Sequence, residues 1–254
     1  MTRRSNVKLL ANTSDLNIQG LNAPIEFRHH PCARRITLRI SQTRRAVIVT
    51  IPPRCRLADA DRFFRHNIDW VRERLGDLPQ PLPFADGVEM PVRGVMHQIR
   101  FTGTARAGGV VRVETAGAVR RLLVSGRREH APRRLKDWLL AQALQDLDAC
   151  VLRHAAALGV RARRISLRDQ TSRWGSCSST GLLSFSWRLI LAPPAVLDYV
   201  AAHEVAHLAE MNHGPRFWKL VARAIPSFDE ARRWLTLNGA TLHRYGCEPD
   251  AAGA

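Results

Sequence analysis

Residues 203–218 read HEVAHLAEMNHGPRFW and contain the clearest structural signal in the chain. In an α-helix, residues four apart are rotated by only about 40° and lie about 6 Å apart along the axis. His203 and His207 therefore project from one helix face and can share a metal ion, whereas Glu204 can reach a water on that metal without binding the metal itself. The apolar neighbours of these residues predict that the helix is buried: Val200, Ala201, Ala202, Val205, Ala206 and Leu208.

A third ligand is needed, because catalytic Zn²⁺ sites use three protein ligands and keep a fourth position for water. We predict His213, because its neighbours Asn212 and Gly214 are residue types that leave a helix through a left-handed turn. Such a turn would bring the His213 imidazole back over the metal. An acid farther along the chain, Asp229 or Glu230, is the alternative third ligand. Either choice predicts one Zn²⁺ per chain.

The residue types in this pattern suit hydrolysis. A bound Zn²⁺ lowers the pKa of its water toward about 7 and polarises a carbonyl group. The carboxylate of Glu204 would accept the proton of the attacking water and deliver it to the leaving amine. The pattern therefore predicts a zinc hydrolase in which Glu204 is the general base.

The first half of the chain alternates between apolar and polar residues, a pattern typical of β-strands. It predicts a hairpin over residues 36–51 and more strands between residues 88 and 124. Between them, apolar residues near helical spacing predict one helix over residues 59–75. This half is therefore expected to be β-rich.

The second half combines helices with short strands. Helical spacing predicts a long helix over residues 132–157, and Pro193-Pro194 begin a helix that runs to about Met211. Strands are predicted at residues 165–168 and 182–191. The chain is therefore predicted to be of the α+β class, with a flexible lead-in (1–22), a β-rich N-terminal domain (23–130), a compact catalytic domain (131–245) and a flexible tail (246–254).

The composition is that of a globular protein with an unusual charge. Of 254 residues, 45% are hydrophobic and 24% are charged, which supplies enough apolar material for a core. Lys and Arg number 39 against 22 Asp and Glu, a net charge of +17. Such a charge favours association with nucleic acid, and a genome rich in arginine codons is the alternative explanation.

Cysteine usage and hydropathy indicate the compartment. Five cysteines without a Cys-x-x-Cys pattern argue against a disulfide framework. No apolar run approaches the roughly 20 residues that cross a bilayer, and the N-terminus lacks the apolar region of a secretory signal. We therefore expect a cytoplasmic protein with no membrane partner.

Two segments together resemble a known enzyme family. Residues 173–200 read RWGSCSSTGLLSFSWRLILAPPAVLDYV, and with residues 203–218 they are similar to the YgjP/SprT-like zinc metallopeptidases. The similarity is close from about Ile165 to Leu235 and weaker over residues 24–130. One departure is Ser186, where the family usually has Asn before the Trp of WRLI. The resemblance implies a zincin-like metallopeptidase domain, with the HExxH helix at its active site, that acts on a protein or peptide substrate.

The resemblance also implies roles for residues outside the metal site. In such peptidases an extended substrate adds to a strand beside the cleft by main-chain hydrogen bonds. The strand over residues 182–191, or the strand next to it, would serve here. The implied substrate contacts are Trp174, Gly175, Ser176, Cys177, Ser184, Ser186 and Tyr199. Plain packing is the alternative role for the tryptophan, the tyrosine and the cysteine among them.

Two other functions compete with the peptidase. The spacing of His203, His207 and His213 is also that of three-histidine metal endoribonucleases, and the charge of +17 would suit RNA. Against this, such ribonucleases do not use the Glu204 position as a general base and lack the WGSCS and WRLI segments. The second competitor is a non-catalytic, zinc-stabilised nucleic-acid-binding module, which would have no need of Glu204 beside an open metal position. We therefore predict a peptidase.

Overall fold

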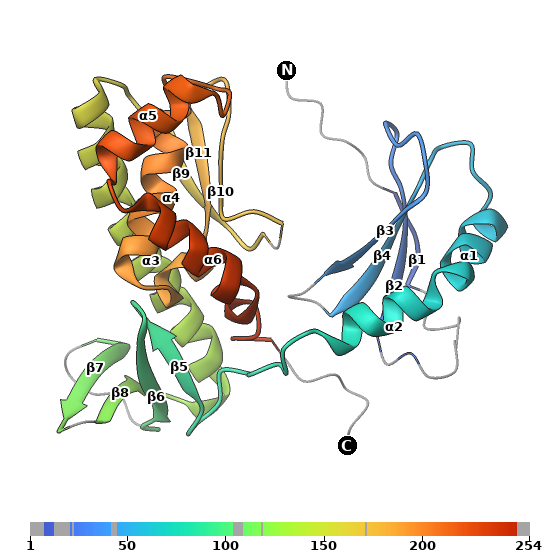
Figure 1. The fold of residues 1–254 in the computed structure, drawn as a ribbon. Helices are drawn as coiled ribbons and strands as arrows, with labels where there is room; N and C mark the ends of the chain where they lie inside the picture. The colour runs from blue at the N-terminus through green and yellow to red at the C-terminus, as the bar shows by residue number, and fades with distance from the viewer. Residues whose placement is uncertain are drawn as a thin grey trace. The chain divides into compact units, whose positions relative to one another are not determined.

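The computed structural model describes residues 8–12, 21, 23–41, 45–103, 109–117, 119–170 and 172–247, and its architecture is mixed α+β, as predicted (Figure 1). The chain divides into two compact units. The first comprises Met1–Gln80 with Glu248–Ala254, and the second comprises Pro81–Cys247. This division lies well before the predicted boundary at residue 130. The predictions of flexibility at the two ends of the chain concern residues that mostly lie outside the described ranges.

The first unit is a four-stranded sheet that packs against two helices. Its elements are β1 Lys8–Asn12, β2 Ile25–His29, β3 Thr37–Ser41, β4 Ala46–Ile51, α1 Leu57–His66 and α2 Ile68–Gly76. The strand order is β1-β2-β4-β3, and the predicted hairpin is the antiparallel pair β3–β4. The single helix predicted over residues 59–75 is two helices. The break falls at Asn67, where the side-chain amide donates to the Phe63 carbonyl at 2.7 Å.

A second four-stranded sheet belongs to the second unit. Its strands are β5 Glu89–Val92, β6 Val95–Phe101, β7 Val111–Ala116 and β8 Val119–Val124, in the order β5-β6-β8-β7. The turn between β5 and β6 docks onto later parts of the chain. The backbone N–H of Arg93 donates to the Ile190 carbonyl at 2.7 Å, and its guanidinium donates twice to Asp146, at 2.8 and 2.9 Å. This docking explains why the sheet groups with the C-terminal part of the chain.

The remainder of the second unit combines helices with a three-stranded sheet. Its elements are η1 Arg128–His130, α3 Ala131–Leu158, β9 Arg164–Arg168, β10 Gly175–Cys177, β11 Leu182–Ser186, η2 Trp187–Leu191, α4 Pro194–Ala206, α5 Pro215–Ala224 and α6 Phe228–Leu242. The strand order is β10-β11-β9, with β11 parallel to β9 and antiparallel to β10. The strand predicted over residues 182–191 ends at Ser186, because its hydroxyl accepts from the backbone N–H of Arg188 and caps the 3-10 helix η2.

Helix α3 supplies the apolar stripe that was predicted for it. The helix ends where Gly159 adopts a left-handed φ of 65°. The helix lies beside α4 (Figure 1). Its fully buried residues belong to the core of the second unit, and they are Ala131, Leu135, Leu139, Ala143 and Leu147. Burial of one leucine side chain contributes about 1.5–3 kcal/mol, so this stripe is a major source of stability. Among the described helices, none has both the length and the apolar character needed to cross a lipid bilayer.

A buried arginine connects η2 by hydrogen bonds to the end of α6 and to the segment that follows it. Arg188 is only 2% exposed, and its guanidinium donates to the Asp169 carboxylate at 2.8 Å. It also donates to the backbone carbonyls of Leu242 at 3.0 Å and Tyr245 at 2.6 Å. A buried charge with this many partners is compensated, whereas removal of one partner would leave it uncompensated. Arg188 therefore holds the end of α6 against the sheet that carries β10.

A second ionic link holds α4 against α3. The Asp198 carboxylate of α4 lies 2.7 Å from the His154 ring and also contacts the Arg153 guanidinium. Burial by itself raises the pKa of Asp198, but the hydrogen bond and charge of His154 and the charge of Arg153 outweigh it, so the pKa is lowered. The charged carboxylate is therefore the favoured form in the folded protein.

We expect Asp198→Asn to lower the free energy of unfolding by about 1–3 kcal/mol at pH 7, the worth of a charged hydrogen bond. Because folding lowers the pKa, this contribution is complete above the unfolded value of about 3.9 and disappears as the pH falls through the folded pKa. Urea unfolding of both proteins at pH 7 and at successively lower pH measures it. Asp148→Asn, at an exposed position of α3, is the control. An equal deficit at every pH would contradict the assignment.

Candidate metal centre

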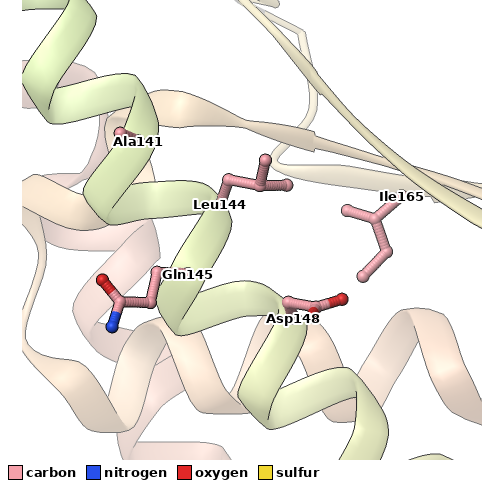
Figure 2. A pocket seen from close by; sticks show the side chains of 5 residues that line it. All are labelled: Ala141, Leu144, Gln145, Asp148 and Ile165. Carbon is pink, nitrogen blue, oxygen red and sulfur yellow. The ribbon is translucent and has the colours of Figure 1, made fainter.

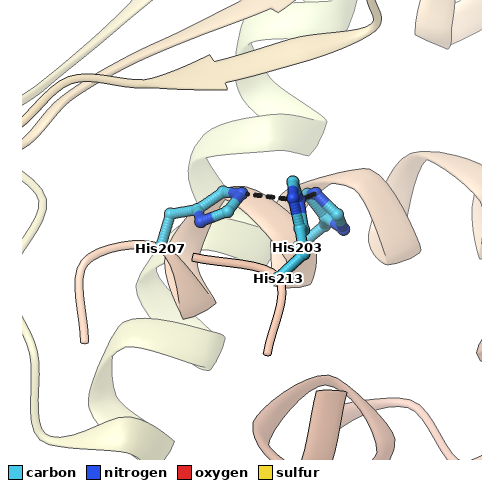
Figure 3. A group of neighbouring side chains, drawn as sticks. All are labelled: His203, His207 and His213. Carbon is cyan, nitrogen blue, oxygen red and sulfur yellow. Dashed lines mark hydrogen bonds between the residues drawn. The ribbon is translucent and has the colours of Figure 1, made fainter. Parts of the chain in front are cut away.

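Three histidines converge at the C-terminal end of α4. His203 lies in the last turn of the helix, His207 directly follows it, and His213 lies in the loop before α5 (Figure 3). The Nε2 atom of His213 lies 3.1 Å from Nε2 of His203 and 3.1 Å from Nε2 of His207. One ring nitrogen from each histidine lies within 4.8 Å of the others. Among the described residues, neither Asp229 nor Glu230 joins this cluster.

The loop brings His213 to the cluster by a route that differs from the predicted one. Asn212 and Gly214 are not among the described residues with a positive φ, and Gly214 has a φ of −80°. The backbone N–H of Gly214 instead donates to the Asn212 carbonyl at 2.7 Å, which closes a tight turn around His213. The helix also ends at Ala206 and not near Met211. The predicted left-handed exit is therefore wrong.

The arrangement of ring nitrogens suits a cation. The Nδ1 atom of His207 lies 3.1 Å from the Glu210 carbonyl oxygen, which can only accept a hydrogen bond. The proton of a neutral His207 ring is therefore on Nδ1, and its Nε2 lone pair points toward His213. Zn²⁺ with Zn–N distances of about 2.0–2.1 Å in tetrahedral geometry places its ligand atoms about 3.3 Å apart, close to the separations seen here. A backbone partner behind a ligating imidazole is also usual in such sites.

Burial favours the neutral form of two of the three imidazoles, His203 and His207. It lowers the pKa of His203 to about 4, with a smaller contribution from the neighbouring histidines. Burial also lowers the pKa of His207, although its hydrogen bond to Glu210 opposes this. Metal ligation requires the neutral form of histidine. His203 and His207 are therefore favoured in the form that binds a cation at neutral pH.

Glu204 lies against a strand that has no side chain at the point of contact. The glutamate is 5% exposed, and its carboxyl group packs on Gly175 at the start of β10. A Cβ atom at position 175 would lie 2.5 Å from the Glu204 Oε1 atom and 2.6 Å from its Cγ atom, which is too close. Burial raises the pKa of Glu204 to about 7, and the nearby positive charge of Arg173 opposes the rise. A carboxyl group with a pKa near 7 suits proton transfer in both directions.

A pocket of about 210 Å³, here called the active-site pocket, opens beside these groups. Its reactive end carries His203 and Glu204. The remaining lining residues come from the loop before β10, from the start of β10, from α4 and from α6, and they are Arg173, Trp174, Gly175, Tyr199, Val200 and Leu235. The pocket therefore joins a candidate metal site to walls that are largely apolar.

The predicted substrate contacts divide between the pocket and the sheet. Trp174, Gly175 and Tyr199 line the active-site pocket. Ser184 does not line it, because its hydroxyl lies 2.7 Å from the Ser166 hydroxyl on the neighbouring strand. Ser186 is buried as the cap of η2. The remaining two, which belong to β10 but not to the pocket lining, are Ser176 and Cys177.

Three pocket residues were missed in the sequence, namely Arg173, Val200 and Leu235. Arg173 directly precedes the WGSCS segment, and Val200 lies four residues before Glu204, which is one helical turn. These two could have been found by extending each motif by one residue or one turn. Leu235 comes from α6, and no pattern in the sequence connects it with the histidines.

A larger, more open hollow lies elsewhere in the second unit, between α3 and β9 (Figure 2). Its volume is about 430 Å³, and its lining residues are Ala141, Leu144, Gln145, Asp148 and Ile165. The lining offers one carboxylate and one amide, without a histidine or cysteine. It therefore has no set of groups that would support hydrolysis or metal binding.

Comparison with known proteins identifies the family. Residues 34–238, which are most of the chain, match the family described as YgjP-like, metallopeptidase domain. The crystal structure of the metallopeptidase zymogen abylysin of Pyrococcus abyssi is similar over 36% of this chain and 93% of its own, with 19% identity and a TM-score of 0.33. A comparison with curated proteins finds no match. The family assignment therefore rests on the sequence match.

We expect His213→Ala to reduce the bound metal from one Zn²⁺ per chain toward none, because two imidazoles remain from a three-ligand set. Metal analysis after dialysis against buffered zinc measures this. Asp229→Ala and Glu230→Ala are matched controls and should keep their metal, since neither acid joins the cluster. Full zinc in His213→Ala together with loss in either control would assign the third ligand to that acid.

Proposed function

We propose a reaction for this site from one premise, that the chain belongs to the YgjP-like metallopeptidase family. The protein would hydrolyse peptide bonds with one Zn²⁺ held by His203, His207 and His213, and Glu204 would be the general base. The observation that supports this most strongly is the convergence of the three Nε2 atoms beside a pocket that also contains the buried Glu204.

The protein residues would each perform one task in this reaction. When bound, Zn²⁺ would lower the pKa of a coordinated water and polarise the peptide carbonyl. Glu204 would take the proton from the attacking water at its carboxylate and pass it to the leaving amine. The burial of Glu204 in the pocket would exclude bulk water from this transfer.

The substrate would bind as an extended chain along β10. This strand is at one edge of its sheet, and its first residue, Gly175, contacts Glu204. A peptide that pairs with a free strand edge gains main-chain hydrogen bonds without regard to its side chains. Of the two strands suggested by the sequence, β10 therefore has better support than β11, which is paired on both sides.

The proposed setting is the cytoplasm. All five cysteines are free thiols, which supports a reducing compartment. Association with nucleic acid would rest on the net charge of +17 alone. The family match likewise favours the peptidase over the ribonuclease and over the non-catalytic binding module.

We expect Glu204→Gln to keep one Zn²⁺ per chain and to lose about 10²–10⁴ in the rate of peptide hydrolysis, the usual worth of a general base. Cleavage of an unfolded reporter protein and metal content, measured on both proteins, give the result. Zinc in both proteins with turnover in the wild type alone is the expected outcome. Undiminished turnover in Glu204→Gln would exclude Glu204 as the base.

We expect Gly175→Ala to keep its metal and to lose about 10²-fold in kcat, because the new methyl group would displace the Glu204 carboxylate by an ångström or so. In the Glu204→Gln background the same change should cost little more, since the base is already gone. Gly76→Ala is the control, because a Cβ there meets nothing within 4 Å. Equal losses in both backgrounds would show that Gly175 acts independently of Glu204.

A further inference from the structure

The walls of the active-site pocket suit a side chain of the substrate. Four of its lining residues are apolar or aromatic, namely Trp174, Tyr199, Val200 and Leu235. Pockets that hold whole small molecules measure about 300–1,000 Å³. The active-site pocket, at about 210 Å³, is smaller than these. It is therefore sized for one side chain.

Both aromatic walls are held in place by stacking. The Tyr199 ring stacks on Phe228 with centroids 6.3 Å apart, and it meets His203 edge-on at 5.9 Å. The Trp174 ring stacks on His243 at 5.1 Å. Stacked aromatic rings lose little freedom when a ligand binds, so the pocket is formed before the substrate arrives.

The pocket lining offers little that would hold a buried acidic side chain. Glu204 is at the reactive end, where a second carboxylate would be repelled. The lining also carries His203, whose burial favours its neutral form, and Arg173, which is exposed and whose guanidinium donates to Gln170 at 2.8 Å. The other lining residues carry no charge that could pair with a buried acid.

We infer that the active-site pocket binds a large apolar side chain of the substrate, of the leucine or phenylalanine type, at a residue flanking the scissile bond. The inference rests on the proposed peptidase function and adds the substrate class to it. Two of the pocket walls, Tyr199 and Val200, lie one helical turn before His203 and Glu204, which line the same pocket. A side chain in this pocket would therefore hold its own peptide bond close to Glu204.

The test uses the full-length, zinc-loaded protein and unstructured peptides whose cleavage sites are mapped by mass spectrometry. The residue on each side of the scissile bond is replaced in turn by leucine, phenylalanine, alanine and aspartate. At one of the two positions, kcat/KM should be about tenfold or more higher for leucine or phenylalanine than for alanine, and lowest for aspartate. Equal values for leucine and alanine at both positions, or fastest cleavage with aspartate, would overturn the inference.

Two variants of the pocket wall connect the preference to its residues. Leu235→Trp should narrow the pocket and bring the leucine-to-alanine ratio of kcat/KM toward one, whereas Leu235→Ala should shift the preference toward phenylalanine. Leu237→Trp is the matched control, because Leu237 is on the same helix and is 71% exposed. Thermal unfolding verifies that each variant is folded. If both Leu235 variants keep the wild-type ratio, the pocket does not set the preference.

The outcomes separate this inference from the proposed function. Wild-type protein that carries zinc and cleaves none of the peptides would overturn both. Cleavage without a preference for large apolar residues would overturn the pocket assignment alone and leave the peptidase intact.

Discussion

The C-terminal end of helix α4 places the buried Glu204 carboxyl group, the half-buried His203 and, directly after the helix, the buried His207 against the apolar core of the second unit. The cost of removing these groups from water constrains everything around them. The cost is visible in the raised pKa of Glu204 and the lowered pKa of His203, each caused first by burial. A cation bound by the imidazoles would offset the cost, and a proton shared with water would do so for the glutamate. The polar groups buried here are therefore the ones that the proposed reaction would use, the Glu204 carboxyl group and the imidazoles.

The neighbours of α4 are shaped by the same constraint. β10 has a glycine where the Glu204 carboxyl group lies, so the strand can approach the helix closely. The tight turn before α5 brings a third imidazole to the two on the helix. The glycine leaves space for the Glu204 carboxyl group, and the turn adds a polar imidazole at the candidate metal site. An ordinary apolar core would need neither feature.

Two arginines link the elements of the second unit, so part of the high arginine content has a structural role. Arg188 joins η2 to the loop that carries Asp169 and to the end of α6. Arg93 joins the β5–β6 turn to Asp146 of α3. The planar guanidinium group can donate to several acceptors at once, which lysine cannot do with the same geometry. Some of the arginines therefore have a structural role inside the second unit, although their pairing with Asp169 and Asp146 leaves the net charge of +17 unchanged.

Local spacing along the chain was enough to predict several features of the fold and of the site. Helical periodicity placed His203, Glu204 and His207 on one turn, alternation predicted the β3–β4 hairpin, and the motif segments indicated the family. Contacts between residues far apart in the chain became known from the folded structure. Two examples are the contact of Gly175 with Glu204 and the place of Leu235 in the pocket wall. A third is the docking of the β5–β6 turn on α3 and η2, since the division between the two units falls after Gln80 and not near residue 130. These contacts depend on long-range packing. Local periodicity predicts which face of a helix or strand is buried, but it does not predict which other element packs against that face.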